Sequence, residues 1–234
     1  MNQNRLVFRD MGCGTGSMGR WLAGRLRGPQ HWVLHDHDTE LLARASVTGA
    51  AADGGRVTFE TREGDLAGLS AEDFAGTSLV TASALLDVLT AGQVDGLAAA
   101  CAAAGCPALL TLSVTGQVEF AEPEPLDADF REAFNDHQRR AGKLGPDAVE
   151  AATEAFARHG MRVLTRPSPW RLGPQESELT AEWLKGWVGA ACEQRPELGG
   201  EADAYLSRRL GERGAGTPHV VVHHTDLLAL GVPS

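Results

Sequence analysis

The chain has 234 residues, a formal net charge of −10, 43% hydrophobic residues and 22% charged residues. This length suits a single α/β domain with a modest insertion. The acidic balance argues against a broad nucleic-acid surface, because phosphate binding needs clustered Lys and Arg. No stretch is apolar enough to span a bilayer, and the polar start leaves no room for a secretory signal. We therefore expect a cytoplasmic protein that binds neither nucleic acid nor membrane.

Apolar runs alternate with helical patterns along the chain, which favours a parallel sheet. The expected strands lie at 5–9, 31–35, 57–59, 78–82, 108–113, 161–165 and 219–223. The expected helices lie at about 17–27, 39–50, 91–104, 127–141, 146–159, 179–194 and 200–213. The four cysteines lack the C-x-x-C spacing of metal ligands, so we expect reduced thiols and no metal site.

The run Asp10–Gly16 (DMGCGTG) joins the first strand to the first helix. Its glycines permit a tight turn and a close approach of the backbone to a ligand, and the helix N-terminus offers free N–H groups. Asp10, two residues before the first glycine, can hold a positively charged group such as an ammonium. The run therefore predicts a socket for a nucleotide-like ligand.

This combination resembles motif I of the class I S-adenosylmethionine (SAM)-dependent methyltransferases. The resemblance implies a Rossmann-like α/β fold with a seven-stranded, mostly parallel sheet, an antiparallel last strand and helices on both faces. It implies one domain over 1–234, in which the insertions 114–145 and 167–213 form a substrate cover. The family usually has helices before the first strand, and here few residues precede it. A parallel sheet needs both faces covered, so we expect the insertions or a second subunit, in a homodimer, to supply the cover.

The same resemblance assigns cofactor contacts. It places Asp10 and Gly12 near the methionine part of SAM, with the backbone of Gly14 and Gly16 beneath it. It gives Asp36 the two ribose hydroxyls, although a helix N-cap is the alternative role. The remaining expected contacts are with the adenine for His37, Asp65 and Leu66, and near the sulfonium for Ser83. Asp65 could instead begin a turn.

The acceptor site is expected in the two insertions. His137 has a suitable unperturbed pKa for a general base, and its spacing from Phe134 places it on the inward face of a helix. Asp136 and Arg140 could bind a polar substrate. Trp170, together with Trp183 and Trp187, could form an aromatic wall for a flat acceptor or could pack as core. His223 and His224 look solvated at the end of the last strand.

These observations predict a SAM-dependent methyltransferase acting on a small metabolite or natural product by in-line displacement, with S-adenosylhomocysteine as the product. The residues after the fourth strand, 81–86 (TASALL), lack an N-P-P-Y-type motif, which mildly favours oxygen or carbon acceptors. One alternative is an NAD-dependent oxidoreductase, since Gly14-x-Gly16-x-x-Gly19 also fits the dinucleotide pattern. It would need a Tyr-x-x-x-Lys pair, and Tyr205 has no lysine four residues on. A second alternative is a SAM-binding scaffold or regulatory protein without catalysis.

Overall fold

The computed structural model describes residues 5–65, 68–211 and 220–231. One mixed sheet organises them, with its strands in the order β3-β2-β1-β4-β5-β8-β6 and with β7 paired to β8. The strands are β1 (Leu6–Met11), β2 (Gln30–Asp36), β3 (Val57–Glu63), β4 (Leu79–Ser83), β5 (Ala108–Phe120), β6 (Arg162–Pro167), β7 (Trp170–Leu172) and β8 (Val220–Leu230). β1 to β5 pair in parallel, and β8 runs antiparallel to its neighbours. The expected fold class is confirmed, with β7 as an additional short strand.

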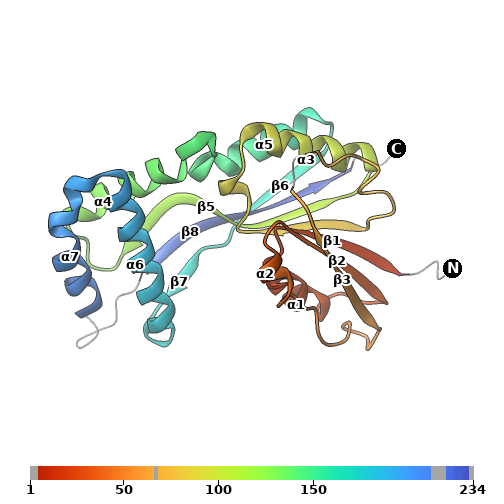
Figure 1. The fold of residues 1–234 in the computed structure, drawn as a ribbon, viewed down its shortest axis with the longest axis horizontal. Coiled ribbons are helices and arrows are strands. Elements are labelled where there is room, and N and C mark those ends of the chain that lie inside the picture. The colour runs from red at the N-terminus through yellow and green to blue at the C-terminus, as the bar shows by residue number, and fades with distance from the viewer. Residues whose placement is uncertain (1–4, 66–67, 212–219, 232–234) are drawn as a thin grey trace.

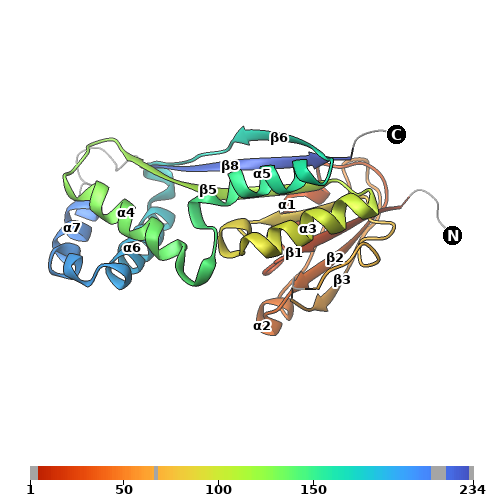
Figure 2. The same cartoon turned by 90° about the horizontal axis from the view of Figure 1, so that it is seen from above.

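Helices cover the two faces of the sheet unequally. The helices are α1 (Ser17–Ala23), α2 (Thr39–Leu42), α3 (Ala91–Ala104), α4 (Leu126–Gln138), α5 (Ala148–Arg158), α6 (Ser177–Gln194) and α7 (Gly199–Gly211). α3 and α5 lie along one face, and α1 and α2 lie on the other beneath β1 to β3 (Figure 1, Figure 2). None of the helices in the described residues combines the length and apolar character that crossing a membrane requires.

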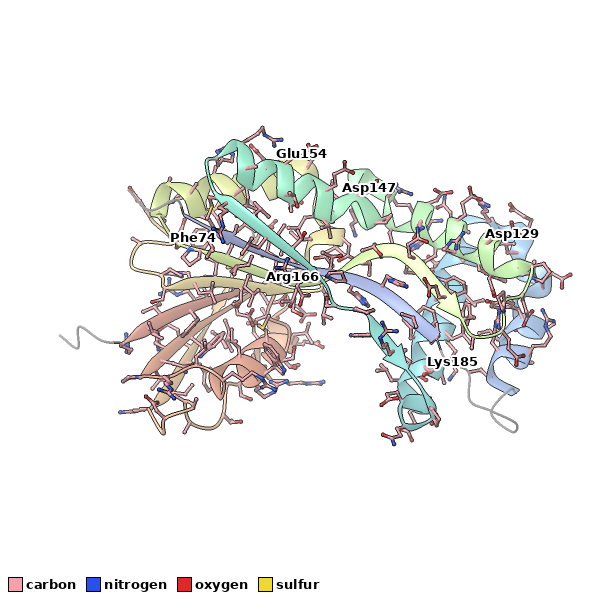
Figure 3. The ribbon with its side chains drawn as sticks, turned by 180° about the vertical axis from the view of Figure 1, so that it is seen from behind. Phe74, Asp129, Asp147, Glu154, Arg166 and Lys185 are labelled. Atoms are coloured by element: carbon pink, nitrogen blue, oxygen red, sulfur yellow. The ribbon has the colours of Figure 1, made fainter. Side chains whose placement is uncertain are left out.

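The largest apolar cluster lies between the sheet and the pair α3 and α5. Phe74, Leu110 and Phe156 are fully buried in it (Figure 3 labels Phe74). α3 begins with a reciprocal capping box between Thr90 and Gln93 and ends at Gly105, whose φ of 65° is the left-handed conformation that glycine tolerates best. These local signals explain why this helix has the bounds expected from the sequence.

α4, α6 and α7 form a separate layer beyond the carboxyl ends of the parallel strands (Figure 1). They pack on the far ends of β5 and β8, around the buried side chains of Phe130, Trp187 and Tyr205. The guanidinium of Arg209 is 1% exposed and lies 4.1 Å from the ring centroid of Phe120. Arg209 also pairs with Asp127, which ties α7 to α4.

Three elements differ most in length from the sequence expectation. α2 ends at Leu42 instead of near 50, because the following segment turns to give the Ser46 N–H to the Thr15 carbonyl at 3.2 Å. β5 continues to Phe120, and β8 continues to Leu230 rather than ending near 223. The two long strands pair with each other beyond the parallel core, and this pairing carries the sheet into the first insertion.

Candidate functional site

The glycine loop after β1 adopts a left-handed backbone at Gly12, Gly14 and Gly16, with φ values of 60°, 54° and 85°. A Cβ atom on Gly12 would lie 2.7 Å from Leu85 Cδ1, and one on Gly16 would lie 2.7 Å from the Ser46 carbonyl oxygen. A Cβ atom on Gly14 would meet nothing within 4 Å. Gly16 is therefore fixed by a backbone contact, Gly12 meets the end of a leucine side chain that can move, and Gly14 has open space in front of it.

Asp10, the next-to-last residue of β1, has a carboxylate whose hydrogen bonds are incomplete. Its side chain is 1% exposed, and Oδ1 accepts a hydrogen bond from the Thr81 hydroxyl at 2.7 Å. Oδ2 is buried and has no hydrogen-bond partner among the described residues. Burial raises the pKa of Asp10 from 3.8 to about 7, with a smaller contribution from the charge of Asp36. A cationic ligand group would stabilise a buried carboxylate that lacks a counter-charge.

Asp36 ends β2 and faces the glycine loop. Its Oδ2 accepts from the Gly14 backbone N–H at 2.7 Å, and its Oδ1 accepts from the Asp38 N–H at 3.0 Å. The helix-cap alternative for Asp36 is wrong, because Asp38 is the residue that caps α2. Each carboxylate oxygen can accept two hydrogen bonds, so Asp36 keeps capacity for a further donor. His37 lies beside it, largely exposed, with Nδ1 3.4 Å from Asp36 Oδ1.

The other expected cofactor residues lie at neighbouring strand ends. Asp65 is exposed shortly after β3, and Leu66 lies outside the described residues. Ser83 is the last residue of β4 and lines a cavity of about 300 Å³. The other residues lining this cavity are Ser17, Met18, Trp21, Thr111, Leu112 and Asp226. The start of α1, the end of β4 and the middle parts of β5 and β8 therefore meet at one opening.

A second cavity, of about 240 Å³, lies between the sheet and the insertion helices. We call it the aromatic cavity, because four of its lining residues are Phe134, Trp170, Trp183 and Trp187. The strands contribute mostly apolar side chains, and the polar members are Asp87, Gln117, Gln138, His223 and His224. Leu112 lines both cavities, so the two are neighbours.

Two non-glycine residues beside the cavities have a left-handed backbone, Ala84 with φ 51° and Leu112 with φ 55°. Leu112 sits where β5 shifts its register against β8. Asp226 Oδ1 accepts from the Leu112 N–H at 3.0 Å and from the Ser168 hydroxyl at 2.7 Å. Such strained residues cluster at functional sites, and they persist where surrounding contacts hold them.

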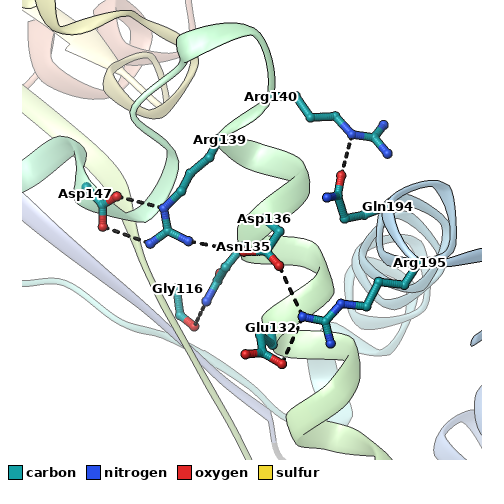
Figure 4. Close-up of polar contacts among 9 residues, drawn as sticks. All are labelled: Gly116, Glu132, Asn135, Asp136, Arg139, Arg140, Asp147, Gln194 and Arg195. Carbon is teal, nitrogen blue, oxygen red and sulfur yellow. Dashed lines mark hydrogen bonds and ion pairs between the residues drawn. The ribbon is translucent and has the colours of Figure 1, made fainter.

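Of the residues expected at the acceptor site, Trp170, Trp183 and Trp187 line the aromatic cavity, and His137, Asp136 and Arg140 do not. His137 Nε2 lies 3.0 Å from Glu193 Oε2 on α6. Asp136 pairs with Arg195, and Arg140 Nε donates to Gln194 Oε1 at 2.6 Å (Figure 4). These contacts tie α4 to the end of α6. The position of His137 therefore gives no support to its expected role as a base.

The sequence analysis missed two residues. His224 is 6% exposed and lines the aromatic cavity, and His223 is only one-third exposed, so the expectation that both are solvated is wrong. Asp226 was not singled out, although its carboxylate holds Leu112 and Ser168. The available signal was the apolar run 227–230, which continues the strand past His224. In the described part of the chain no three His, Cys, Asp or Glu side chains gather as metal ligands would.

No protein-family model and no curated protein sequence matches the chain. Solved structures do match its fold. A SAM-dependent methyltransferase from Methanosarcina mazei aligns over 100% of this chain and 95% of its own, with a TM-score of 0.53 and 10% identity. The cyclopropane synthase MmaA2 from Mycobacterium tuberculosis aligns over 97% of this chain and 79% of its own, with a TM-score of 0.51 and 13% identity. The chain therefore has the fold of the class I SAM-dependent methyltransferases.

Proposed function

We propose that this protein is a SAM-dependent methyltransferase that methylates a small-molecule acceptor. The observation that carries the proposal is the buried, unpartnered Oδ2 of Asp10 at the start of a glycine loop whose Gly14 has open space before it. The fold supplies the context, since the mycolic acid cyclopropane synthase CmaA1, with a TM-score of 0.51, was solved with S-adenosylhomocysteine.

SAM would lie across the carboxyl ends of β1, β2 and β4. In this proposal Asp10 faces the ammonium group, where the ligand charge would stabilise the ionised carboxylate. Gly14 lets the backbone approach the ligand, and the spare lone pairs of Asp36 accept from the ribose hydroxyls. The remaining proposed contacts come from Gly12, Gly16, His37, Asp65, Leu66 and Ser83.

The acceptor would occupy the aromatic cavity, which adjoins the proposed cofactor site through Ala84 and Leu112. The two insertions, 114–145 and 167–213, would then act as its cover. Trp170 is the residue from the sequence analysis that we keep as an acceptor contact. Holding an acceptor in line and away from water can supply much of the rate acceleration in such a displacement.

Thermal unfolding with SAM, S-adenosylhomocysteine and NAD side by side tests the cofactor. A ligand at about 100 times its dissociation constant adds roughly 2.7 kcal/mol to stability, which for this size corresponds to a rise of about 5–10 °C in Tm. We expect that rise with SAM or S-adenosylhomocysteine and none with NAD. A rise with NAD alone would favour the oxidoreductase alternative. Binding of SAM without release of S-adenosylhomocysteine across a broad acceptor panel would favour the scaffold alternative.

We also propose a homodimer. Leu109, Leu228 and Leu164 occupy adjacent positions across β5, β8 and β6, and all three are half-buried. They lie on the face opposite α3 and α5, because their neighbours Leu110 and Leu227 pack under those helices. A second copy would cover this row. Sedimentation equilibrium that gives a monomer mass at micromolar concentration would refute the dimer.

We propose a cytoplasmic location because the cysteines are not paired in disulfides. Cys13, Cys101, Cys106 and Cys192 are all free thiols. Free thiols are the usual state in a reducing compartment, whereas secreted proteins tend to form disulfides. Fractionation of the native host would test this location, with recovery in the soluble intracellular fraction as the expected outcome.

A further inference from the structure

The lining of the aromatic cavity restricts the charge of what can enter it. Among the described residues that line it there is no Lys or Arg, so an anionic group would lose its hydration without gaining a counter-charge. The indoles of Trp183 and Trp187 stack with their centroids 5.5 Å apart. Flat aromatic walls favour flat, apolar ligands. The cavity therefore suits a neutral planar molecule.

His224 is one of two imidazoles on β8, with His223, that line this cavity. Val222 and His224 are two residues apart on β8 and share one face of the strand, and both line the cavity. The His224 ring lies 5.1 Å from the Trp170 ring, centroid to centroid. β7 holds Trp170 in place by pairing it with Val222. The imidazole and an aromatic wall of the cavity are thus fixed by the same strand pair.

A backbone contact fixes which ring nitrogen of His224 carries the proton. Nδ1 lies 3.0 Å from the Val222 carbonyl oxygen, and a carbonyl oxygen can only accept. Nδ1 is therefore the donor, and in the neutral ring Nε2 carries the lone pair. Nε2 makes no hydrogen bond to any residue that the structure describes. The one basic atom of this imidazole is thus unused by the protein.

The surroundings keep that ring neutral. Burial lowers the pKa of His224 below its usual 6.5. It outweighs the hydrogen bond to the Val222 carbonyl and the charge of Asp226, which both raise the pKa. The other titratable groups nearby are His223 on the same strand and Asp87, which lines the same cavity. Burial raises the pKa of Asp87. His223 Nε2 lies 3.1 Å from Glu119 Oε1 but makes no hydrogen bond within the described residues.

We propose that His224 is the general base of the reaction, and that it removes the proton at Nε2 from the hydroxyl of a neutral, planar acceptor such as a phenol. This inference rests on the proposed function. When bound, SAM supplies an electrophilic methyl group, and its transfer to the acceptor oxygen breaks the carbon–sulfur bond, leaves that electron pair on sulfur and releases the hydroxyl proton. His224 takes up this proton as an imidazolium, whose Nδ1–H stays bonded to Val222, and then passes it to water.

The first test needs neither SAM nor turnover. Long-range proton–nitrogen NMR of the ring distinguishes the two tautomers, and the His224→Asn spectrum assigns the signals. We expect His224 in the Nδ1–H form at pH 7, with a pKa below 6.5. An Nε2–H form, or an imidazolium at pH 7, would overturn the proposal.

The second test probes the cavity with 1-naphthol and its methyl ether, using calorimetry. A hydrogen bond to Nε2 should make naphthol bind about 2- to 10-fold more tightly than the ether to the wild-type protein. In His224→Asn the ratio should fall to about 1, because asparagine keeps a donor for Val222 and is too short to place an acceptor at the Nε2 position. The control is His137→Asn, which should keep the preference. Failure of both probes to bind the wild-type protein, or a preference that survives in His224→Asn, would refute the proposal.

A third measurement separates this proposal from the proposed function. His224→Asn should keep the thermal shift with SAM, because His224 lies outside the proposed cofactor contacts. With a phenol that is turned over, kcat should fall at least tenfold while the affinity for SAM stays unchanged. A wild-type protein that binds naphthol with the expected preference and gives no shift with SAM would refute the methyltransferase and leave the assignment of Nε2 intact. Equal losses of SAM binding and kcat in His224→Asn would assign His224 a structural role.

Discussion

The carboxylate of Asp36 accepts a hydrogen bond from the Gly14 backbone N–H, with 2.7 Å between Oδ2 and the nitrogen. The acid after β2 therefore shapes the loop that the proposed cofactor contacts. We expect Asp36→Ala to lower the free energy of unfolding by about 1–3 kcal/mol, because it leaves buried donors unsatisfied. It should also weaken SAM binding. Urea unfolding and calorimetry measure the two effects.

Asp53→Ala is the matched control for Asp36. Asp53 also joins two loops, through the backbone N–H groups of Gly28 and Gly55, but it is exposed. Asp53→Ala should lower the free energy of unfolding by less than Asp36→Ala does, and it should leave SAM affinity unchanged. Asp36→Ala with wild-type affinity for SAM would show that the ligand does not use this end of the sheet.

Gly14→Ala tests the open space before the glycine loop. The added Cβ meets no protein atom within 4 Å, so the direct cost is that of a left-handed backbone, about 1–2 kcal/mol. SAM affinity should fall at least tenfold, because the methyl group would enter the proposed ligand volume. Calorimetric titration of the folded variant measures this loss.

Gly105→Ala is the control for Gly14→Ala. Gly105 has a comparable φ of 65° and equally open surroundings, and it ends α3. It should show a similar loss of stability and no change in SAM binding. If both alanine variants bind SAM equally well, the glycine loop does not contact the cofactor.

Asp10 should make the ligand-free protein sensitive to pH. Its pKa of about 7 in the folded state exceeds the usual 3.8, so the folded state binds the proton more tightly than the unfolded state. This contribution to stability is complete below about pH 4 and is lost as the pH rises to about 7. Asp10→Asn should therefore become more stable relative to wild type between pH 5 and pH 8. Thermal melts across that range measure the difference, and parallel curves for the two proteins would contradict it.

The ligand should reverse this effect of Asp10. If the ammonium group of SAM faces the carboxylate, SAM favours the ionised form, and its affinity for the wild-type protein should increase with pH through about 7. Asp10→Asn should bind SAM more weakly and without that increase. Calorimetry in buffers with different ionisation enthalpies also reports the proton released on binding.

Arg209 should be essential for the stability of the insertion. Its side chain is buried against Phe120, and it pairs with Asp127 and donates to the Glu122 carbonyl at 2.7 Å. Removal of one member of a buried ion pair costs about 3–5 kcal/mol, so Arg209→Met should lower the urea midpoint strongly. The adjacent Arg208 is 47% exposed and pairs with Glu124, and Arg208→Ala should cost less than about 1 kcal/mol. Equal effects of the two substitutions would show that the buried ion pair of Arg209 with Asp127 does not stabilise the insertion.

The parallel core could be predicted from the sequence because its signals are local. Thr90 and Gly105 bracket α3 with a cap at each end, and the apolar runs of β1, β2, β4 and β5 mark strands of the buried sheet. α2 could not be predicted to its end. Its last expected residues leave the helix for a long-range contact between Ser46 and Thr15, which no local pattern encodes.

The aromatic cavity depends on contacts between distant segments, so its residues were harder to predict. His224 reaches the cavity because β8 continues beyond it and pairs with both β5 and β7. The helical spacing of His137 relative to Phe134 was interpreted as an inward face, yet Glu193 on α6 lies within 3.0 Å and draws the imidazole away. Such a choice between two partners is decided by tertiary packing, which a helical pattern does not specify.

β5 and β8 pair, with two register shifts, from the helix-covered core, where Leu110 and Leu227 are buried, to the aromatic cavity, where Val118 and Val222 pair. The floor of the cavity therefore belongs to the same sheet that carries the glycine loop. A ligand that binds there meets a backbone that is already ordered. Little of the binding free energy is therefore lost in ordering the backbone. Differences in acceptor choice among proteins built this way should then follow from side chains on α4 and α6, while the strands beneath them stay the same.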